Sequence, residues 1–191
     1  MADTPNPKVH YTLPKTVVMV GMMGAGKTAV GRALAQRLGV AFLDSDAEIE
    51  VAANRTVPEI FERDGEAFFR DKETQIIERL LIDKRCILST GGGAFLSEKN
   101  RNNISAQGIS VCLNADLELL WNRVCSKDTR PLLRTDDPKA TLKKLYDQRM
   151  PIYSLADLTL CSSPEYSIED MVDQVIDALI ARKNILEVHN A

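Results

Sequence analysis

The chain has 191 residues, 45% of them hydrophobic and 27% charged, and its formal net charge is −3. This size and balance are typical of one soluble globular domain that buries its own core without disulfides or metals. The slightly acidic charge argues against broad contact with nucleic acid or with a membrane surface. An anionic ligand would therefore need a local cationic pocket.

Two further classes of protein are disfavoured. The two histidines lie near the chain ends, and no C-x-x-C pair occurs among the cysteines, so a zinc site is not expected. Scattered cysteines favour small core residues in a reducing cytosol, and here they are Cys86, Cys112, Cys125 and Cys161. No apolar run reaches the ~18 residues that span a bilayer.

The chain ends differ from the middle in composition. The first 14 residues contain three prolines and no hydrophobic segment, which is typical of a loose tail and not of a secretion signal. We predict a flexible tail over residues 1–14, one domain over 15–183 and a C-terminal tail over 184–191.

From residue 15 onward, strand and helix patterns alternate. Strands are predicted over Lys15–Val20, Ala41–Leu43, Arg85–Ser89, Ile109–Leu113 and Leu158–Cys161. Helices are predicted over Thr28–Leu38, Ala47–Ala53, Val57–Arg63, Glu66–Leu81, Asp116–Cys125, Pro138–Met150 and Ile168–Ile180. This order predicts an α/β fold with a parallel sheet covered on both faces. Ligands of such folds bind beyond the carboxyl ends of the strands.

A glycine-rich loop follows the first of these strands. Gly21–Thr28 reads G-M-M-G-A-G-K-T and fits G-x-x-x-x-G-K-[ST] between a strand and a helix, which is the context of a phosphate-binding loop. Lys27 would reach the β- and γ-phosphates, and the Thr28 hydroxyl would bind Mg²⁺. A glycine turn without a ligand is the alternative. A guanine-reading Asn-Lys-x-Asp is absent, which disfavours a GTPase.

Two acids follow the second strand, in Asp44-Ser45-Asp46. If the strand continues that far, both side chains point the same way. One acid could hold the Mg²⁺ water shell, and the other could orient an attacking hydroxyl or accept its proton. The alternative is that Asp46 caps the helix that follows.

Three consecutive glycines, Gly91–Gly93, follow the strand that ends at Ser89. So permissive a backbone suits a loop that lies against a ligand. A flexible surface turn is the alternative. With this loop, all three unusual segments follow predicted strand ends, where the ligands of such folds bind.

Three arginines could grip a small anionic substrate or the transferring phosphate. Arg70 could instead pair with Glu66 or Glu73 at helical spacing. Arg149 could instead be a charge near the C-terminus of its helix, because Pro151 would stop that helix. Arg130 lies in a polar stretch that would form a closing lid, or it could be a solvated loop charge.

Together these segments resemble shikimate kinases, and the resemblance extends from about Val17 to Leu179. Phe68 stands where that family usually has another residue, and the basic residue of its turn near adenine is missing from Cys161–Glu165. Six ordered segments carry the resemblance, namely Gly21–Thr28, Asp44–Asp46, Phe69-Arg70, Gly91–Gly93, Thr129–Leu133 and Arg149–Tyr153.

The resemblance implies ATP-dependent phosphorylation of the 3-hydroxyl of shikimate, with Mg²⁺ as cofactor. It implies a three-layer α/β/α fold with five parallel strands in the order 2-3-1-4-5 and a mobile lid over about 126–137. We also expect a cytoplasmic monomer with no nucleic-acid or membrane partner. A related small-molecule kinase, such as one for gluconate, and a nucleotide-binding module without turnover are the alternatives.

The resemblance also implies a role for each matching residue. ATP would bind Gly24, Ala25, Gly26, Lys27, Thr28, Ala29, Arg123 and Arg130. The acceptor would bind Asp46, Arg70, Gly91, Gly92, Gly93 and Arg149. Catalysis would depend on Lys27, Asp46 and Arg130, and Mg²⁺ would be held by Thr28 and, through water, by Asp44.

Overall fold

A five-stranded parallel sheet forms the centre of the computed structural model, which describes residues 9–126 and 131–190. The strand order is β3-β4-β2-β5-β6. The strands are β2 (Thr16–Val20), β3 (Ala41–Asp44), β4 (Cys86–Ser89), β5 (Gly108–Asn114) and β6 (Leu158–Cys161). Counted within this sheet, the order is 2-3-1-4-5, and this prediction is confirmed.

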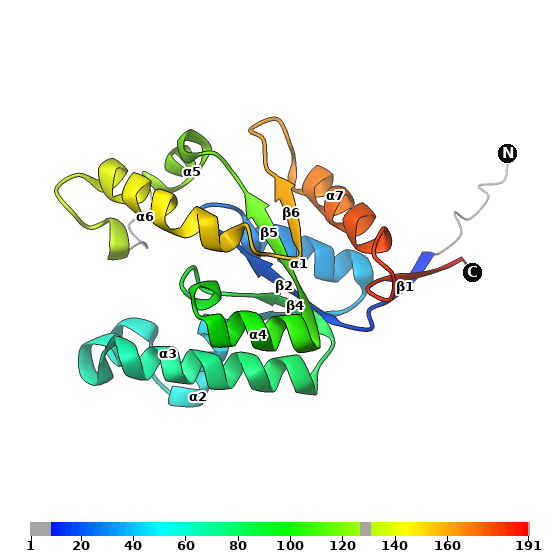
Figure 1. Cartoon of the computed structure of the whole chain (residues 1–191), viewed down its shortest axis with the longest axis horizontal. Coiled ribbons are helices and arrows are strands. Elements are labelled where there is room, and N and C mark those ends of the chain that lie inside the picture. The colour runs from blue at the N-terminus through cyan, green and yellow to red at the C-terminus, as the bar shows by residue number, and fades with distance from the viewer. Residues whose placement is uncertain (1–8, 127–130, 191) are drawn as a thin grey trace, which may run out of the picture.

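Two layers of helices cover the sheet. The helices are α1 (Lys27–Leu38), α2 (Ser45–Ala53), α3 (Val57–Asp83), α4 (Glu98–Gln107), α5 (Leu117–Val124), α6 (Pro138–Tyr153) and α7 (Ile168–Ile180). Helix α1 packs against α7, and α3 packs against α4 (Figure 1). Right-handed crossovers explain the two pairs, because the chain leaves β2 and β4 in opposite directions along the sheet.

The three central strands are buried nearly throughout, whereas the edge strands β3 and β6 are partly exposed. Helices on both faces require central strands that are apolar on both sides. This is why TVVMV and CILS read as continuous apolar runs in the sequence, without the alternation of a half-exposed strand.

Three helices differ from their prediction. Helix α3 runs over both predicted segments with a kink at Gly65, whose φ of 84° and ψ of 170° suit glycine alone. Helix α6 passes Pro151 and ends at Tyr153, so the proline does not stop it. Helix α4 was not predicted at all, because only Asn100 and Ile104 of its ten residues are buried and no apolar stripe marks it.

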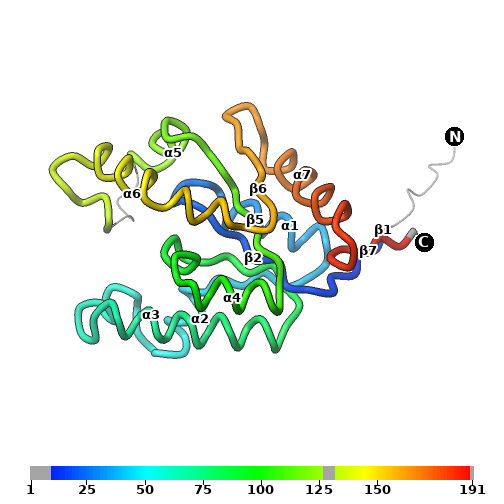
Figure 2. Tube along the Cα trace, in the orientation of Figure 1, coloured from blue at the N-terminus to red at the C-terminus, as the bar shows by residue number. Residues whose placement is uncertain are grey.

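The two chain ends pair with each other. Strands β1 (Val9–Thr12) and β7 (Glu187–Asn190) form an antiparallel ribbon (Figure 2) where we had expected only loose tails. The ribbon lies toward the amino end of β2, away from the carboxyl ends of the sheet. Ile185 and Leu186, just before β7, are 7% and 6% exposed and belong to the core. Their burial explains why the end of the chain folds back.

Two kinds of feature are absent from the part of the chain that the structure describes. Within 9–126 and 131–190, no helix is long and apolar enough to cross a membrane. The same residues contain no group of three or more histidine, cysteine or acidic side chains that could hold a metal ion. The expectation that the cysteines are core residues is confirmed for Cys86 and Cys112, which are buried in the sheet, and is wrong for Cys125 and Cys161, which are exposed.

Two truncations separate the core contribution of the C-terminal segment from its strand pairing. Stopping the chain after Lys183 removes Ile185, Leu186 and β7, and we expect the free energy of unfolding to fall by about 3 kcal/mol, since each buried aliphatic side chain contributes about 1.5–3 kcal/mol. Stopping after Leu186 removes only the strand β7 and its pairing with β1, and we expect a loss of about 1 kcal/mol or less. Urea unfolding measures both; equal losses would contradict this assignment.

Candidate active site

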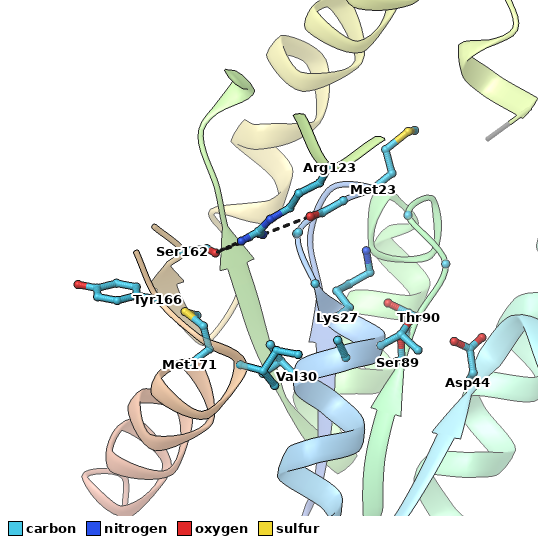
Figure 3. A pocket seen from close by; sticks show the side chains of 18 of the residues that line it. Met23, Lys27, Val30, Asp44, Ser89, Thr90, Arg123, Ser162, Tyr166 and Met171 are labelled. Carbon is cyan, nitrogen blue, oxygen red and sulfur yellow. Dashed lines mark hydrogen bonds between the residues drawn. The ribbon is translucent and has the colours of Figure 1, made fainter. Parts of the chain in front are cut away.

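A cavity of about 630 Å³ opens at the carboxyl ends of the strands. Its wall includes the glycine-rich loop, the two acids at and just after the end of β3 and glycines that follow β4. This is the edge of the sheet at which ligand binding was predicted. In Figure 3, Lys27, Thr90 and Asp44 lie on one side of the cavity, and Tyr166 and Met171 lie on the other. Arg123 lies above the loop between these two sides.

The glycine-rich loop has the backbone that its sequence predicts. Gly21, Gly24 and Gly26 have φ values of 132°, 82° and 98°, which L-residues rarely adopt. A Cβ at Gly21 would lie 2.8 Å from the carbonyl oxygen of Leu113. Helix α1 begins directly after the loop, so its positive end faces the cavity. This arrangement binds polyphosphate.

Lys27 reaches back over the loop from the first position of α1. Its Nζ donates to the carbonyl oxygens of Gly21 and Met22, at 2.8 and 3.0 Å. Thr28 and Ala29 follow it and also line the cavity. The ammonium group is therefore placed at the loop where the phosphates would lie.

The helix cap after β3 is Asp44 and not Asp46, the residue we had weighed as a cap. Oδ1 of Asp44 accepts from the amides of Asp46 and Ala47, at 3.0 and 3.4 Å. The strand ends at Asp44, so the acids are not arranged by strand alternation. Both still line the cavity, because α2 starts at its edge.

Asp46 is an acid under electrostatic stress. Burial and the Asp44 charge raise its pKa to about 6, and the charges of Lys27 and Arg70 only partly oppose this. Its Oδ1 is buried and accepts no hydrogen bond within the described part of the chain. A desolvated carboxyl with this pKa is mostly ionised at neutral pH and binds a proton more strongly than an ordinary carboxylate, which suits a general base.

All three glycines lie against side chains, and Gly91 and Gly92 also line the cavity. A Cβ at Gly91 would lie 2.7 Å from Oδ1 of Asp46, and one at Gly93 would lie 2.5 Å from both terminal nitrogens of Arg70. The backbone therefore touches the acid and the arginine directly. The amide of Gly91 donates to Oγ of the fully buried Ser45 at 3.2 Å.

Arg70 makes the helical ion pairs that we had weighed as an alternative, yet it is also part of the site. Nη1 donates to Glu73 at 2.8 Å, and Nη2 to Glu66 at 3.3 Å. Glu73 is only 1% exposed, so the first pair is not a surface pair. Burial works to lower the pKa of Arg70, but the two glutamates outweigh it and the pKa is raised. Arg70 thus stays cationic.

Arg149 lies on α6 beside the middle glycine. A Cβ at Gly92 would lie 3.6 Å from Nη1 of Arg149 and 3.8 Å from the Tyr153 hydroxyl. That hydroxyl donates to the carbonyl of Gly92, and burial raises the pKa of Tyr153 to about 12. Because α6 continues to Tyr153, Arg149 does not lie in its last turn, and the helix-dipole alternative loses its basis.

Arg123 lines the cavity beside the glycine-rich loop. It donates to the carbonyl of Gly24 at 3.3 Å and to Oγ of Ser162 at 3.4 Å (Figure 3). Ser162 belongs to the segment that lacks the family's basic residue. Its hydroxyl holds Arg123 against the loop, while Tyr166 and Met171 provide an apolar wall.

Part of the predicted lid lies outside the described residues, and Arg130 with it. Beyond that gap, Pro131–Leu133 form a short 3-10 helix, and Asp137 caps α6. Leu133 is 8% exposed and joins the core. The described end of the predicted lid segment therefore packs against α6.

Several residues that build the site were missed in the sequence. Ser45 and Tyr153 are buried partners of predicted residues, and each stands in a predicted motif. Their motif positions could have marked them. Ser162 carried no signal, because its contact with Arg123 joins positions 39 residues apart.

A phosphate loop at the carboxyl edge of a 2-3-1-4-5 sheet, with a buried acid and two arginines beside it, defines a P-loop kinase. The sequence profile of the family described as "Shikimate kinase" matches residues 23–180. The chain belongs to the shikimate kinase family.

Individual relatives agree with this membership. The chain is 70% identical to the shikimate kinase of Ruegeria pomeroyi over 176 residues, covering 92% of this chain and 90% of that protein. It is 60% identical to that of Cereibacter sphaeroides over 180 residues, covering 94% and 90%. The solved "Shikimate kinase from Acinetobacter baumannii in complex with shikimate" superposes with a TM-score of 0.82 at 39% identity, covering 90% and 96%.

The stress on Asp46 predicts that Asp46→Asn stabilises the protein at neutral and higher pH. Because the folded protein holds this proton up to about pH 6, ionisation costs stability as pH rises from the usual carboxyl range through 6. We expect Asp46→Asn to raise the free energy of unfolding by about 1–2 kcal/mol at pH 8, which is less than a rise in pKa to about 6 would give for a fully buried acid, because Asp46 is only partly buried.

The gain should shrink toward pH 4.5, where the wild-type acid is protonated. Urea unfolding at both pH values measures it. Asp177→Asn, at an exposed position of α7, is the matched control, and we expect it to change little at either pH. An Asp46→Asn variant that is less stable than wild type at pH 8 would contradict the prediction.

Proposed function

We infer that this protein transfers the γ-phosphate of ATP to the 3-hydroxyl of shikimate, releasing ADP and shikimate 3-phosphate. Family membership and the relatives at 70% and 60% identity support this activity. The observation that carries the mechanism is that Asp46, which lies against Gly91, interacts electrostatically with Lys27 of the phosphate loop and with Arg70 beside the glycine loop.

At the nucleotide side, the loop amides of Gly24–Thr28 and the ammonium of Lys27 bind the phosphates. Arg123 and the wall at Tyr166 and Met171 hold the rest of the nucleotide. Arg130 would come from the lid to stabilise the transferring phosphate.

The oxygen donors at the cavity fit Mg²⁺. Thr28 and Asp44 both line it, and Asp44 uses only Oδ1 to cap α2, which leaves Oδ2 to a water of the metal. When bound, Mg²⁺ supplies charge that offsets the phosphate oxygens. The hydroxyl and the carboxylate are the ligand types that this hard cation prefers.

At the acceptor side, Arg70 and Arg149 clamp a carboxylate, because two guanidinium groups offer bidentate donors. Gly91, Gly92 and Gly93 lie between them and Asp46 and line the ring hydroxyls. A carboxylic acid that carries hydroxyl groups matches these residues, because the arginines bind its carboxylate and Asp46 accepts a proton from its hydroxyl. The solved complex of the Acinetobacter baumannii shikimate kinase with shikimate supports the assignment.

The chemical step is an in-line transfer. The acceptor hydroxyl oxygen forms a bond to the γ-phosphorus, and the bond from that phosphorus to the β–γ bridging oxygen breaks. The hydroxyl proton passes to Asp46, and the electron pair of the broken bond leaves with ADP. Catalysis comes mainly from positioning and from charge stabilisation by Lys27 and Arg130.

We further propose that the protein acts as a cytoplasmic monomer without nucleic-acid or membrane partners. The net charge of −3 and the cysteines in reduced form support this setting.

Acceptor-dependent ADP release tests the function. We expect turnover with ATP, Mg²⁺ and shikimate, and much less with gluconate, because a flexible acid does not present its hydroxyl to Asp46 in the same place. Asp46→Asn should keep ATP affinity and lose about 10²-fold or more in kcat, the range for a general base. Nucleotide binding without turnover on any hydroxy acid would sink the assignment.

Two glycine substitutions separate the roles of Asp46 and Arg70. Alanine at Gly93 would push the Arg70 guanidinium aside, so we expect the KM for shikimate to rise about tenfold or more with a smaller change in kcat. Alanine at Gly91 would displace the Asp46 carboxylate, so kcat should fall most. Steady-state kinetics measure both. The opposite pattern would show that the two contacts have been assigned the wrong roles.

A further inference from the structure

The glycine loop has no side chain with which to hold its own shape, so its neighbours must hold it. A short 3-10 helix, Ala94–Leu96, follows it directly. The amide of Ala94 donates to the carbonyl of Gly91, and the amide of Leu96 donates to the carbonyl of Gly93, both at 3.1 Å. The orientation of the glycine peptides is therefore tied to this 3-10 helix.

The 3-10 helix is in turn held by two adjacent residues of α4. Nδ2 of Asn100 donates to the carbonyl of Ala94 at 2.9 Å. Nη1 of Arg101 donates to the carbonyls of Phe95 and Leu96, at 2.9 and 2.8 Å. Three consecutive carbonyl groups are thus occupied by side chains from a single turn of helix.

This support rests on a fixed base. Asn100 is fully buried, and Ile104, one turn further on, is 1% exposed. Helix α4 packs against β5 and α3, and α3 also carries Arg70. The contacts of α4 therefore connect the glycine loop to the same framework that holds the arginine beside it.

We propose that Asn100 and Arg101 are positioning residues for the acceptor site. Neither lines the cavity. They fix the position of the glycine loop, which lies so close to Asp46 and Arg70 that a Cβ atom on the loop would clash with them. A shift of about 1 Å in such a site can cost on the order of 10²-fold in rate, so the loop needs support that its own sequence does not provide.

Loss of this support should affect one substrate only, whereas a general loss of stability would affect the binding of both substrates. The phosphate loop is held by β2, β5 and α1 and has no contact with Asn100 or Arg101 in the described hydrogen bonds. Loss of the Arg101 contacts should therefore weaken shikimate binding and leave ATP binding nearly unchanged. The inference rests on the proposed function.

Arg101→Ala provides the test, because Arg101 is only half-buried, whereas replacing the fully buried Asn100 risks the fold. We expect the KM for shikimate to rise about tenfold, within the range for supporting residues of a site, with the KM for ATP within about twofold of wild type. Arg101→Lys should recover part of the loss, because an ammonium group can donate to one of the two carbonyls.

Arg85→Ala is the matched control. Arg85 also donates to a backbone carbonyl, that of Leu81 at 3.3 Å, but at the amino end of β4. We expect both KM values to stay within about twofold of wild type. The melting temperature is measured for every variant, so that a general loss of stability can be recognised.

An equal rise in both KM values, or an unchanged KM for shikimate with a lower melting temperature, would overturn the inference and leave Arg101 a structural residue. A wild-type protein that releases no ADP with shikimate would refute the proposed function. A wild-type protein that turns over, beside an Arg101→Ala variant with normal kinetics, would refute this inference alone.

Discussion

The desolvated carboxylate of Asp46 is the constraint on which the rest of the site depends. A buried acid without hydrogen-bond donors for one of its oxygens costs stability. The cations of Lys27 and Arg70 offset part of that cost, and the pKa of about 6 shows that they do not remove it. A fully satisfied carboxylate would be a stable ion and a weak base. The protein keeps the acid reactive by leaving it incompletely satisfied.

The glycine loop follows from this arrangement. Asp46, Arg70 and Arg149 can surround a small acceptor only if the backbone of the glycine loop lies close against their side chains. The space that remains is too small for a Cβ atom at Gly91 or Gly93. Glycine solves the steric problem but leaves the loop without anchoring side chains. The supports are therefore supplied from elsewhere in the chain, by Ser45 to the amide of Gly91 and by Tyr153 to the carbonyl of Gly92.

The sequence predicted the parts of the molecule in which local pattern and final environment agree. Buried strands such as β2 and β4 are continuous apolar runs, and the phosphate loop depends on glycines whose φ values are encoded locally. The order of the strands came from the resemblance to a family and not from periodicity. The terminal ribbon was not predictable in this way, because β1 and β7 lie at opposite ends of the sequence and no local pattern indicates that they pair.

The acids after β3 show a different limit. Asp44 and Asp46 are both reasonable caps by residue type, and the choice depends on where β3 stops. A shift of one or two residues in a strand end, which no local pattern resolves, exchanges the two roles. Contacts such as Arg123 to Ser162 have no local pattern at all, since they form only when α5 and the turn after β6 meet.

Helix α4 connects these limits to function. Its one internal face is built from Asn100 and Ile104, and its neighbour Arg101 spends its donors on the backbone of the 3-10 helix. A helix that packed only by hydrophobic contact could slide or rotate slightly at little cost. Directional bonds to three carbonyls fix its register against the glycine loop. The polar composition of α4 is the reason that its sequence shows no apolar stripe. The same polar side chains provide the hydrogen bonds that hold the glycine loop in place.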